Sequence, residues 1–221
     1  MSTRVYLIRH GATVLSAEDR FAGATNVELS EEGIAQVRAL AARLSVEHVD
    51  AVYSSPLKRT LDTARIIAEP HSVHVSSDDR LREISHGRWE GLTRAEVEAR
   101  FEGEYAKWEE DPFTFAPESG ESGVAAMARA LPAIRDLVTR SQGKCIAIIS
   151  HKATIRLILC GLLGIDARGY RDRLDQSPAS LNVLEFKDVV RARLMTYNDT
   201  SHYTVSPRRP EGLSKWWPAK A

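Results

Sequence analysis

The apolar run at residues 145–150 constrains the fold more than any other stretch of this chain. Its sequence, Cys-Ile-Ala-Ile-Ile-Ser, has no polar alternation, which is typical of a central parallel strand that is covered on both faces. Residues 5–8, Val-Tyr-Leu-Ile, form a second apolar run that is rich in β-forming residues. Strands of this kind need helices on both faces of the sheet. The sequence therefore predicts an α/β fold, a three-layer sandwich with a mostly parallel central sheet.

The remaining segments alternate between helical and extended patterns. Helices are predicted at residues 31–44, 56–68, 93–100, 121–140 and 152–163, and strands at residues 50–54, 73–75, 179–186 and 190–195. Pro132 is expected to bend or split the fourth helix. Residues 102–122 show no regular pattern, and such a segment is often a lid or a binding loop. We expect one domain over residues 1–205, with a lid-like excursion around 92–122 and a C-terminal tail at 206–221.

Composition excludes several classes of partner. Lys and Arg together number 30 and are balanced by 30 Asp and Glu, which argues against binding to nucleic acid or to an anionic membrane. We find no apolar run of signal-peptide or transmembrane length. Cys145 and Cys160 are expected to be reduced thiols in the core rather than a disulfide or a metal pair. Together these features favour a cytoplasmic protein.

Two of the predicted strands end at a histidine. Residues 5–8 are followed by Arg9-His10, and the run at 145–150 is followed by His151. The carboxyl ends of parallel strands lie on one edge of a sheet, so these residues could meet there, and Arg59 would point to the same edge. Guanidinium and imidazolium groups at a helix N-terminus are suited to phosphate recognition. Taken singly, Arg59 could be a solvated helix charge and His151 a hydrogen-bonded histidine, but the set favours an anion site.

These motifs and several others follow one another in a family-like order. The chain resembles the histidine phosphatase superfamily, also called the phosphoglycerate-mutase-like family, over nearly its whole length. The resemblance rests on Arg9-His10-Gly11-x-Thr13, Leu29-Ser30-x-x-Gly33, Ser54-Ser55-Pro56-Leu57-x-Arg59-Thr60-x-x-Thr63-Ala64, Leu81-x-Glu83-Ile84-x-x-Gly87-x-Trp89-Glu90-Gly91, Gly120-Glu121-Ser122 and Ser150-His151-x-x-x-Ile155-Arg156.

The resemblance implies a set of catalytic roles. His10 would be the nucleophile that becomes phosphohistidine, Arg9, Arg59 and His151 would hold the phosphoryl group, and Glu83 would be the general acid. Phosphoryl transfer depends on positioning and on charge stabilisation, which cations around the phosphoryl oxygens supply. The same cations should lower the pKa of His10 and keep its imidazole neutral. Neither a metal ion nor another cofactor is expected.

The predicted substrate-binding residues are less uniform. They are Thr13, Ser16, Gly23, His86 and Lys152. Ser16 stands where the family usually has a phosphate-binding asparagine, and Lys152 stands where most members have glycine after the second histidine. Lys152 is either a solvated cation or a contact to a second anionic group, and its unfavourable place at a helix N-terminus tilts the interpretation towards a ligand. His86 could line the substrate side or be an ordinary loop histidine.

The interval between Glu83 and His151 is short for a cofactor-dependent phosphoglycerate mutase, and residues 99–122 are acidic rather than basic. We therefore predict a metal-independent phosphatase that acts on a small phosphorylated metabolite, with the mutase as the first alternative. A non-catalytic phosphate-binding module is the second. A metal-dependent hydrolase is disfavoured because Arg9 and Arg59 would repel the cation.

The tail at residues 206–221 is not explained by the family pattern. It contains Trp216 and Trp217, which could dock on their own domain, near the site, or on a second subunit. The sequence therefore leaves a homodimer open.

Overall fold

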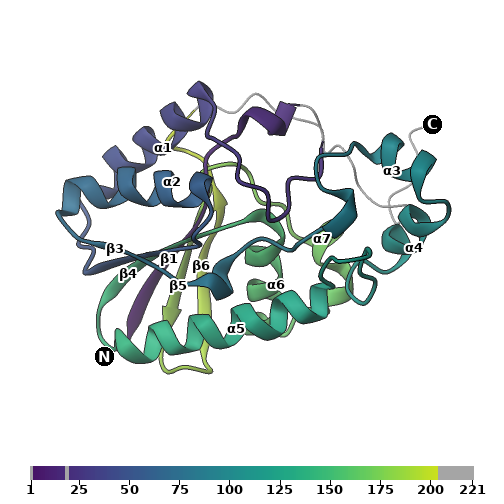
Figure 1. Ribbon diagram of the computed structural model, residues 1–221. Coiled ribbons are helices and arrows are strands. Elements are labelled where there is room, and N and C mark those ends of the chain that lie inside the picture. The colour runs from purple at the N-terminus through teal and green to yellow at the C-terminus, as the bar shows by residue number, and fades with distance from the viewer. Residues whose placement is uncertain (1, 18–19, 204–221) are drawn as a thin grey trace.

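The computed structural model describes residues 2–17 and 20–203, and its six strands form one mixed sheet (Figure 1). The strand order is β3-β2-β4-β1-β5-β6. β3, β2, β4 and β1 pair in parallel, whereas β5 and β6 are antiparallel additions at one edge. The strands are β1 (Thr3–Arg9), β2 (Ala51–Ser54), β3 (Val75–Ser77), β4 (Cys145–Ser150), β5 (Leu181–Phe186) and β6 (Ala192–Asp199).

Helices cover both faces of this sheet, which is the predicted α/β sandwich. They are α1 (Glu31–Leu44), α2 (Lys58–Ala68), α3 (Arg94–Arg100), α4 (Glu104–Glu110), α5 (Gly123–Arg140), α6 (Lys152–Leu163) and α7 (Tyr170–Arg173). Short 3-10 helices are η1 (Val14–Ala17), η2 (Glu69–His71), η3 (Asp79–Leu81), η4 (Gly87–Trp89) and η5 (Ala167–Gly169). α1 and α2 lie on one side of the sheet and α5 and α6 on the other (Figure 1).

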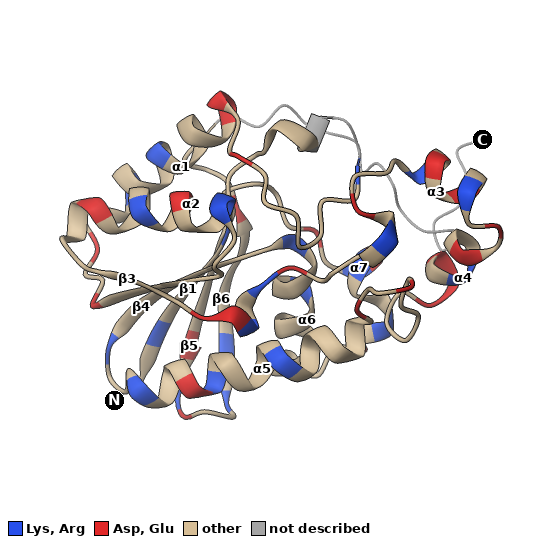
Figure 2. Cartoon of the chain, in the orientation of Figure 1, with Lys and Arg blue, Asp and Glu red and all other residues tan. Residues whose placement is uncertain are grey.

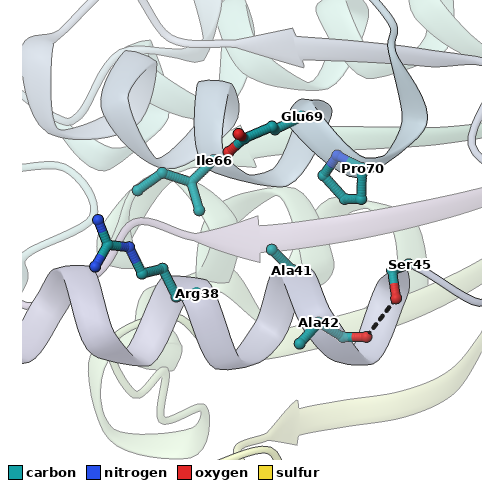
Figure 3. Close-up of a pocket in the computed structure, with 7 residues that line it drawn as sticks. All are labelled: Arg38, Ala41, Ala42, Ser45, Ile66, Glu69 and Pro70. Atoms are coloured by element: carbon teal, nitrogen blue, oxygen red, sulfur yellow. Dashed lines mark hydrogen bonds between the residues drawn. The ribbon is translucent and has the colours of Figure 1, made fainter.

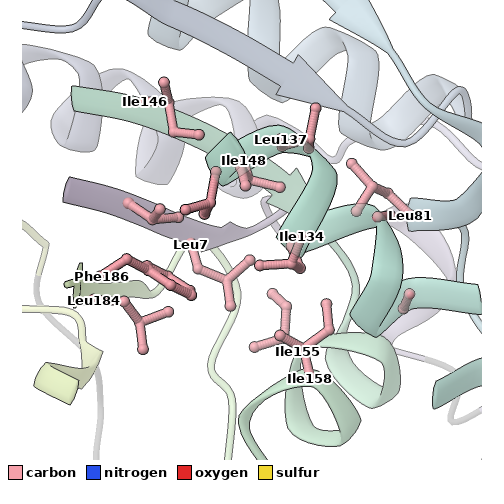
Figure 4. Close-up of a cluster of buried hydrophobic side chains, with 14 of the residues drawn as sticks. Leu7, Leu81, Ile134, Leu137, Ile146, Ile148, Ile155, Ile158, Leu184 and Phe186 are labelled. Carbon is pink, nitrogen blue, oxygen red and sulfur yellow. The ribbon is translucent and has the colours of Figure 1, made fainter. Parts of the chain in front are cut away.

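The two apolar strands β1 and β4 are buried on both faces, as their unbroken hydrophobic sequences predict. Leu7 and Ile148 point to the α5–α6 side, where they pack with Ile134, Ile155 and other buried side chains (Figure 4). Their neighbours on the same strands, Tyr6 and Ile8 on β1 and Ala147 and Ile149 on β4, point to the α1–α2 side and join a second core cluster. Each face of the sheet therefore carries its own apolar core, and the sheet is held rigidly between the two.

Local sequence signals fix where several helices begin or end. The Ser30 side chain accepts a hydrogen bond from Gly33 N at the start of α1. Thr93 and Glu96 form a capping box at the start of α3. Gly164 ends α6 in the left-handed conformation, with φ of 68°.

Three details differ from the sequence-based expectations. Residues 102–122 are not without regular structure, because α4 lies within them and its Trp108 and Tyr105 are buried. α5 passes through Pro132 without being split. β3 begins at Val75, two residues later than predicted. The first expectation failed because tertiary packing outweighs local propensity in a short segment, and of the two outcomes expected at Pro132, bending or splitting, splitting does not occur.

Charges on the described surface are mixed. Figure 2 shows acidic and basic positions interspersed along the helices on both sides of the sheet. Among the described residues, no helix is both long and apolar enough to cross a membrane. Cys145 and Cys160 are both free thiols, as expected, and Cys160 is buried. The predicted tail at residues 206–221 lies outside the described residues.

Candidate active site

The two predicted catalytic histidines lie side by side at the carboxyl edge of the sheet. In the parallel pairing of β1 with β4, Arg9 is opposite Ser150, so the next residues, His10 and His151, leave the sheet together. The His10 amide donates a hydrogen bond to the Ser150 carbonyl at 3.1 Å. The two imidazole centroids are 5.2 Å apart. Strand register therefore brings together two residues that are far apart in sequence.

The backbone after His10 approaches α1 so closely that neither contact residue can carry a side chain. A Cβ atom on Gly33 would lie 2.0 Å from the Ala12 carbonyl oxygen, and one on Gly11 would lie 2.6 Å from the Gly33 carbonyl oxygen. The amide of Ser30 also donates to the Ala12 carbonyl at 2.9 Å. These contacts fix the segment that presents His10 against the N-terminus of α1.

His10 is oriented by its own neighbour. Its Nδ1 lies 2.7 Å from the Gly11 carbonyl oxygen, and since a carbonyl only accepts, Nδ1 carries the proton. In the neutral ring Nε2 then keeps its lone pair. Burial, followed by the positive charges of Arg59 and Arg9, lowers the pKa of His10 well below its ordinary value of 6.5, although the bond to Gly11 opposes this shift. The side chain is therefore neutral and correctly oriented to act as a nucleophile through Nε2.

His151 is held by a guanidinium on one side and a hydroxyl on the other. Arg59 Nε donates to His151 Nδ1 at 3.2 Å, so Nε2 carries the ring proton and donates to Ser55 Oγ at 2.8 Å. Burial is the main cause that lowers the pKa of His151 well below 6.5, and Arg59 and His10 add to it. His151 is thus a neutral ring without exposed surface.

Arg59 is buried in the first turn of α2 and is fixed by backbone carbonyls. Its Nη1 and Nη2 donate to the carbonyl oxygens of Thr25 and Gly23, each at 2.8 Å. Gly23, predicted to bind substrate, is therefore placed where it positions Arg59. Burial lowers the pKa of Arg59 from its ordinary value, yet a guanidinium stays charged at neutral pH. The alternative interpretation of Arg59 as a solvated charge on a helix is therefore wrong.

Arg9 leaves the end of β1 as a second cation of the site, and its side chain is partly buried. Its Nη1 donates to the Gln176 carbonyl oxygen at 2.5 Å, while its Nε is buried without a hydrogen-bond partner among the described residues. Burial first and the nearby Arg156 second lower the pKa of Arg9 to about 10. The side chain of Gln176 is itself buried and hydrogen-bonds to Asn182 on β5 at 2.9 Å. Arg9 thus rests on a rigid polar support.

Glu83 lies against the N-terminus of α6, which begins directly after His151. Its carboxylate accepts hydrogen bonds from the amides of Ala153 at 3.2 Å and Thr154 at 3.1 Å, and lies 3.0 Å from the Thr154 hydroxyl. Arg129 on α5 donates to the Glu83 carbonyl at 3.1 Å and holds this loop in place. Glu83 also contributes to the electrostatic environment of Arg9 and Arg59. It is therefore placed in the same group of side chains as the two histidines.

The predicted substrate-binding residues fall into different places. Thr13 is 6% exposed and bridges to Leu29, next to the catalytic segment. Ser16 lies in η1, and its side chain is outside the described part of the structure. Lys152 is the first residue of α6, and burial followed by the positive charge of Arg9 lowers its pKa to about 7. Figure 2 shows basic positions where α2 and α6 begin.

His86 belongs to an aromatic cluster next to the site. Its other rings are those of Phe21, Trp89, Tyr105 and Trp108, and Val97 packs with them. The His86 ring centroid is 4.8 Å from that of Phe21 and 6.0 Å from that of Trp108. Burial lowers the pKa of His86 to about 4, although the carboxylates of Glu83 and Glu90 act in the opposite direction.

Three further residues support the site without having been predicted as site residues. Ser55 accepts a hydrogen bond from the His151 ring, and the Thr154 hydroxyl contacts Glu83. The Glu90 carboxylate accepts hydrogen bonds from the Ala24 amide and the Thr25 hydroxyl. Ser55 and Glu90 lie inside the motifs that carry the family resemblance, so the sequence contains a signal that could have indicated their role. Thr154 carried no signal, because its role depends on how α6 meets the Glu83 loop.

A pocket elsewhere on the molecule is formed by α1 and α2. Arg38, Ala41, Ala42, Ser45, Ile66, Glu69 and Pro70 line it (Figure 3). None of the predicted site residues is among them. In the described part of the chain, no group of three or more His, Cys, Asp or Glu side chains could hold a metal ion.

Comparison with known proteins agrees with this geometry. Residues 5–200 match the model of the histidine phosphatase superfamily (branch 1). Phosphoserine phosphatase 1 of Hydrogenobacter thermophilus is 35% identical, over 74% of this chain and 77% of its own. Glucosyl-3-phosphoglycerate phosphatase of Mycolicibacterium vanbaalenii is 34% identical, over 73% of this chain and 75% of its own.

Solved structures show the same architecture. Bacillus stearothermophilus YhfR superposes with a TM-score of 0.85 at 28% identity, covering 90% of this chain and 98% of its own. The native mycobacterial glucosyl-3-phosphoglycerate phosphatase superposes with a TM-score of 0.80 at 31% identity, covering 90% of this chain and 99% of its own.

Proposed function

The chain belongs to the histidine phosphatase superfamily, and we propose that it hydrolyses small phosphomonoesters through a phosphohistidine on His10. The predicted family, its α/β fold and the phosphatase branch are confirmed by the relatives. One observation carries the proposed chemistry. The Nδ1 proton of His10 is held by the Gly11 carbonyl, which leaves Nε2 free in a ring kept neutral by burial and by the adjacent cations.

The first step is attack on phosphorus by the Nε2 lone pair of His10. A bond forms between Nε2 and phosphorus, the bond from phosphorus to the leaving oxygen breaks, and Glu83 in its acid form gives its proton to that oxygen. Arg9 and Arg59 stabilise the charge on the phosphoryl oxygens. His151, next to both His10 and Arg59, would complete the phosphoryl-binding group by transferring its Nε2 hydrogen bond from Ser55 Oγ to a phosphoryl oxygen.

The second step returns the enzyme to its starting state. A water molecule attacks phosphorus while Glu83, now a carboxylate, takes a proton from it. The bond between phosphorus and Nε2 breaks, and inorganic phosphate leaves. The cations that favoured attack also favour this step, because both transition states carry charge on the same phosphoryl oxygens.

The relatives support a small phosphorylated metabolite as substrate. They are named as phosphatases of phosphoserine and of glucosyl-3-phosphoglycerate, and neither name is that of a mutase. The binding-module alternative is also disfavoured, because His10, Glu83 and His151 are all present with the two arginines beside them. We place substrate binding on Thr13, Ser16 and the residues around Lys152.

The setting of the enzyme is part of the same proposal. Two free cysteine thiols, one of them buried, support a location in the reducing cytoplasm. A single domain over residues 1–205 is supported by the family match over residues 5–200. The segment at 92–122, which packs through Trp108 next to His86, would act as a lid.

The test is phosphate release from p-nitrophenyl phosphate in the presence of EDTA, with wild type and His10→Ala compared. We expect full activity of the wild type with chelator and a loss of at least about 10⁴-fold in the variant, because the covalent step is removed. Acid-labile phosphoenzyme should form in the wild type alone. Loss of activity in EDTA, or phosphoenzyme that survives His10→Ala, would rule out this mechanism.

A further inference from the structure

A second group of cations adjoins the catalytic histidines and is not needed to hold the phosphoryl group. Lys152 and Arg156 lie one turn apart on α6 and both face Asp175, which precedes the residue that supports Arg9. Arg156 Nη2 is 3.1 Å from Asp175 Oδ1, and Lys152 Nζ is 3.9 Å from the same oxygen. One carboxylate therefore faces two positive charges.

Neither cation is fully satisfied by this carboxylate. The Arg156 side chain is only 9% exposed, and its Nε is buried without a hydrogen-bond partner among the described residues. Lys152 Nζ makes no hydrogen bond within the described part of the chain, since 3.9 Å is too long for one. The buried Arg156 Nε is costly without an acceptor, and the part-exposed Lys152 ammonium has donors that a ligand from solvent can take up.

The electrostatic environment of Lys152 is unfavourable in the empty protein. Burial first, and then the positive charges of Arg9 and Arg156, lower the pKa of Lys152 to about 7, while Asp175 acts in the opposite direction. Arg94 adds a weaker repulsion. Lys152 is also the first residue of α6, where a positive charge is opposed by the helix dipole. An anion bound here would relieve all of these repulsions together.

We propose that Lys152 and Arg156 form a subsite for a second anionic group, a carboxylate on the alcohol part of the substrate. The proposal rests on the proposed phosphatase function, because Arg9 and Arg59 are taken to hold the phosphoryl group. Asp175 neutralises one of the two cations, which leaves one positive charge and therefore suits a monoanion better than a second phosphate. The subsite is reachable from solvent, since the side chains of Lys152 and Asp175 are 43% and 69% exposed.

The subsite makes Lys152 a residue that selects substrates rather than one that accelerates phosphoryl transfer. The charge of Arg9, which is taken to hold the phosphoryl group, acts on Lys152, so an anion bound at the Lys152 ammonium lies within electrostatic range of the phosphoryl site. A substrate with a carboxylate a few bonds from its phosphate would engage both sites at once. One without the carboxylate would still reach His10, but with lower affinity.

A matched pair of substrates tests this directly. 3-Phosphoglycerate and glycerol 3-phosphate share the phosphate and the three-carbon chain, but one ends in a carboxylate and the other in a hydroxymethyl group. We expect the wild type to prefer 3-phosphoglycerate in kcat/KM, mainly through KM. We expect Lys152→Met to lower kcat/KM for 3-phosphoglycerate by about tenfold to a hundredfold, because a charge-assisted hydrogen bond is lost. The value for glycerol 3-phosphate should change by less than about threefold.

The control is Lys187→Met, which removes an exposed lysine at the far end of β5 and should alter neither value. Lys152→Arg should restore most of the preference, and Arg156→Gln should reduce it in the same way as Lys152→Met. An equal loss for both substrates, no loss for either, or a wild type without preference would overturn the subsite. Hydrolysis of p-nitrophenyl phosphate by the wild type separates these outcomes from a failure of the phosphatase proposal, which would leave that substrate intact.

Discussion

The strand-end site and the aromatic cluster beside it are both buried, but they are built in opposite ways. The site takes Arg9, His10 and His151 from neighbouring strand ends, where backbone pairing fixes their positions. The aromatic cluster takes Trp89 and Trp108 from short helical segments, and its geometry comes from ring packing, with their centroids 5.8 Å apart. In the first region the sheet positions the polar groups, whereas in the second the side chains position the backbone.

This difference predicts a difference in response to mutation. A change in the strand-end site should remove catalytic groups while the two apolar cores on either side of the sheet stay intact. A change in the aromatic cluster should remove packing that α3 and α4, each of seven residues, cannot replace. The regions meet at Glu90, whose carboxylate binds the amide of His86 and also the Thr25 hydroxyl beside Arg59.

The largest effect on stability is expected for Trp108→Ala. Trp108 is 6% exposed and contacts the rings of Phe21, Trp89 and Tyr105, with the Arg171 guanidinium 3.7 Å from its ring centroid. We expect the free energy of unfolding in urea, followed by circular dichroism, to fall by about 3–5 kcal/mol. Trp108→Phe should lose less. A large loss of kcat with unchanged stability would contradict the division between the two regions.

The next effect is catalytic and concerns Arg59→Lys. Lysine keeps the positive charge but cannot bond His151 Nδ1 and the carbonyls of Gly23 and Thr25 together. We expect kcat/KM for p-nitrophenyl phosphate to fall by about 10²–10³-fold, as for loss of a positioned transition-state donor. Arg65→Lys on the same helix is the control, because its side chain is 67% exposed. A loss below tenfold would mean that charge alone suffices at this position.

Much of the strand-end site could be predicted from sequence because its signals are local. An apolar run that ends in histidine indicates both a strand and its carboxyl end, and parallel strands place those ends on one edge. The proximity of His10 and His151 follows from these two facts. The contacts of Gly23 with Arg59 and of Thr154 with Glu83 could not be predicted, because they depend on where two loops meet in space.

The aromatic cluster could not be predicted from the sequence, for a related reason. Residues 102–122 contain aromatic side chains among prolines and glycines, without a helical period that would reveal α4. The helix is stabilised by Trp108 and Tyr105 packing against residues far along the chain, which a local pattern does not contain. The alternatives for His86 could not be separated for the same reason, since its partners Phe21 and Trp108 lie 65 residues before and 22 residues after it in sequence.

The smallest expected effect is the pH dependence of stability that His86 contributes. It separates this neutral histidine of the aromatic cluster from His10 and His151, the two neutral histidines of the site. The pKa of His86 is lowered to about 4, so the unfolded chain, with a histidine pKa near 6.5, binds its proton first as the pH falls. His86 therefore favours folding fully above pH 6.5, and this contribution is lost between pH 6.5 and 4. His86→Gln cannot titrate, and its stability should fall less steeply over that window, by up to about 1.4 kcal/mol per pH unit, in urea unfolding at several pH values. His10 and His151 keep their own pH dependence in both proteins, so the difference between the two curves isolates His86. Parallel curves would show that the ring is protonated within the cluster.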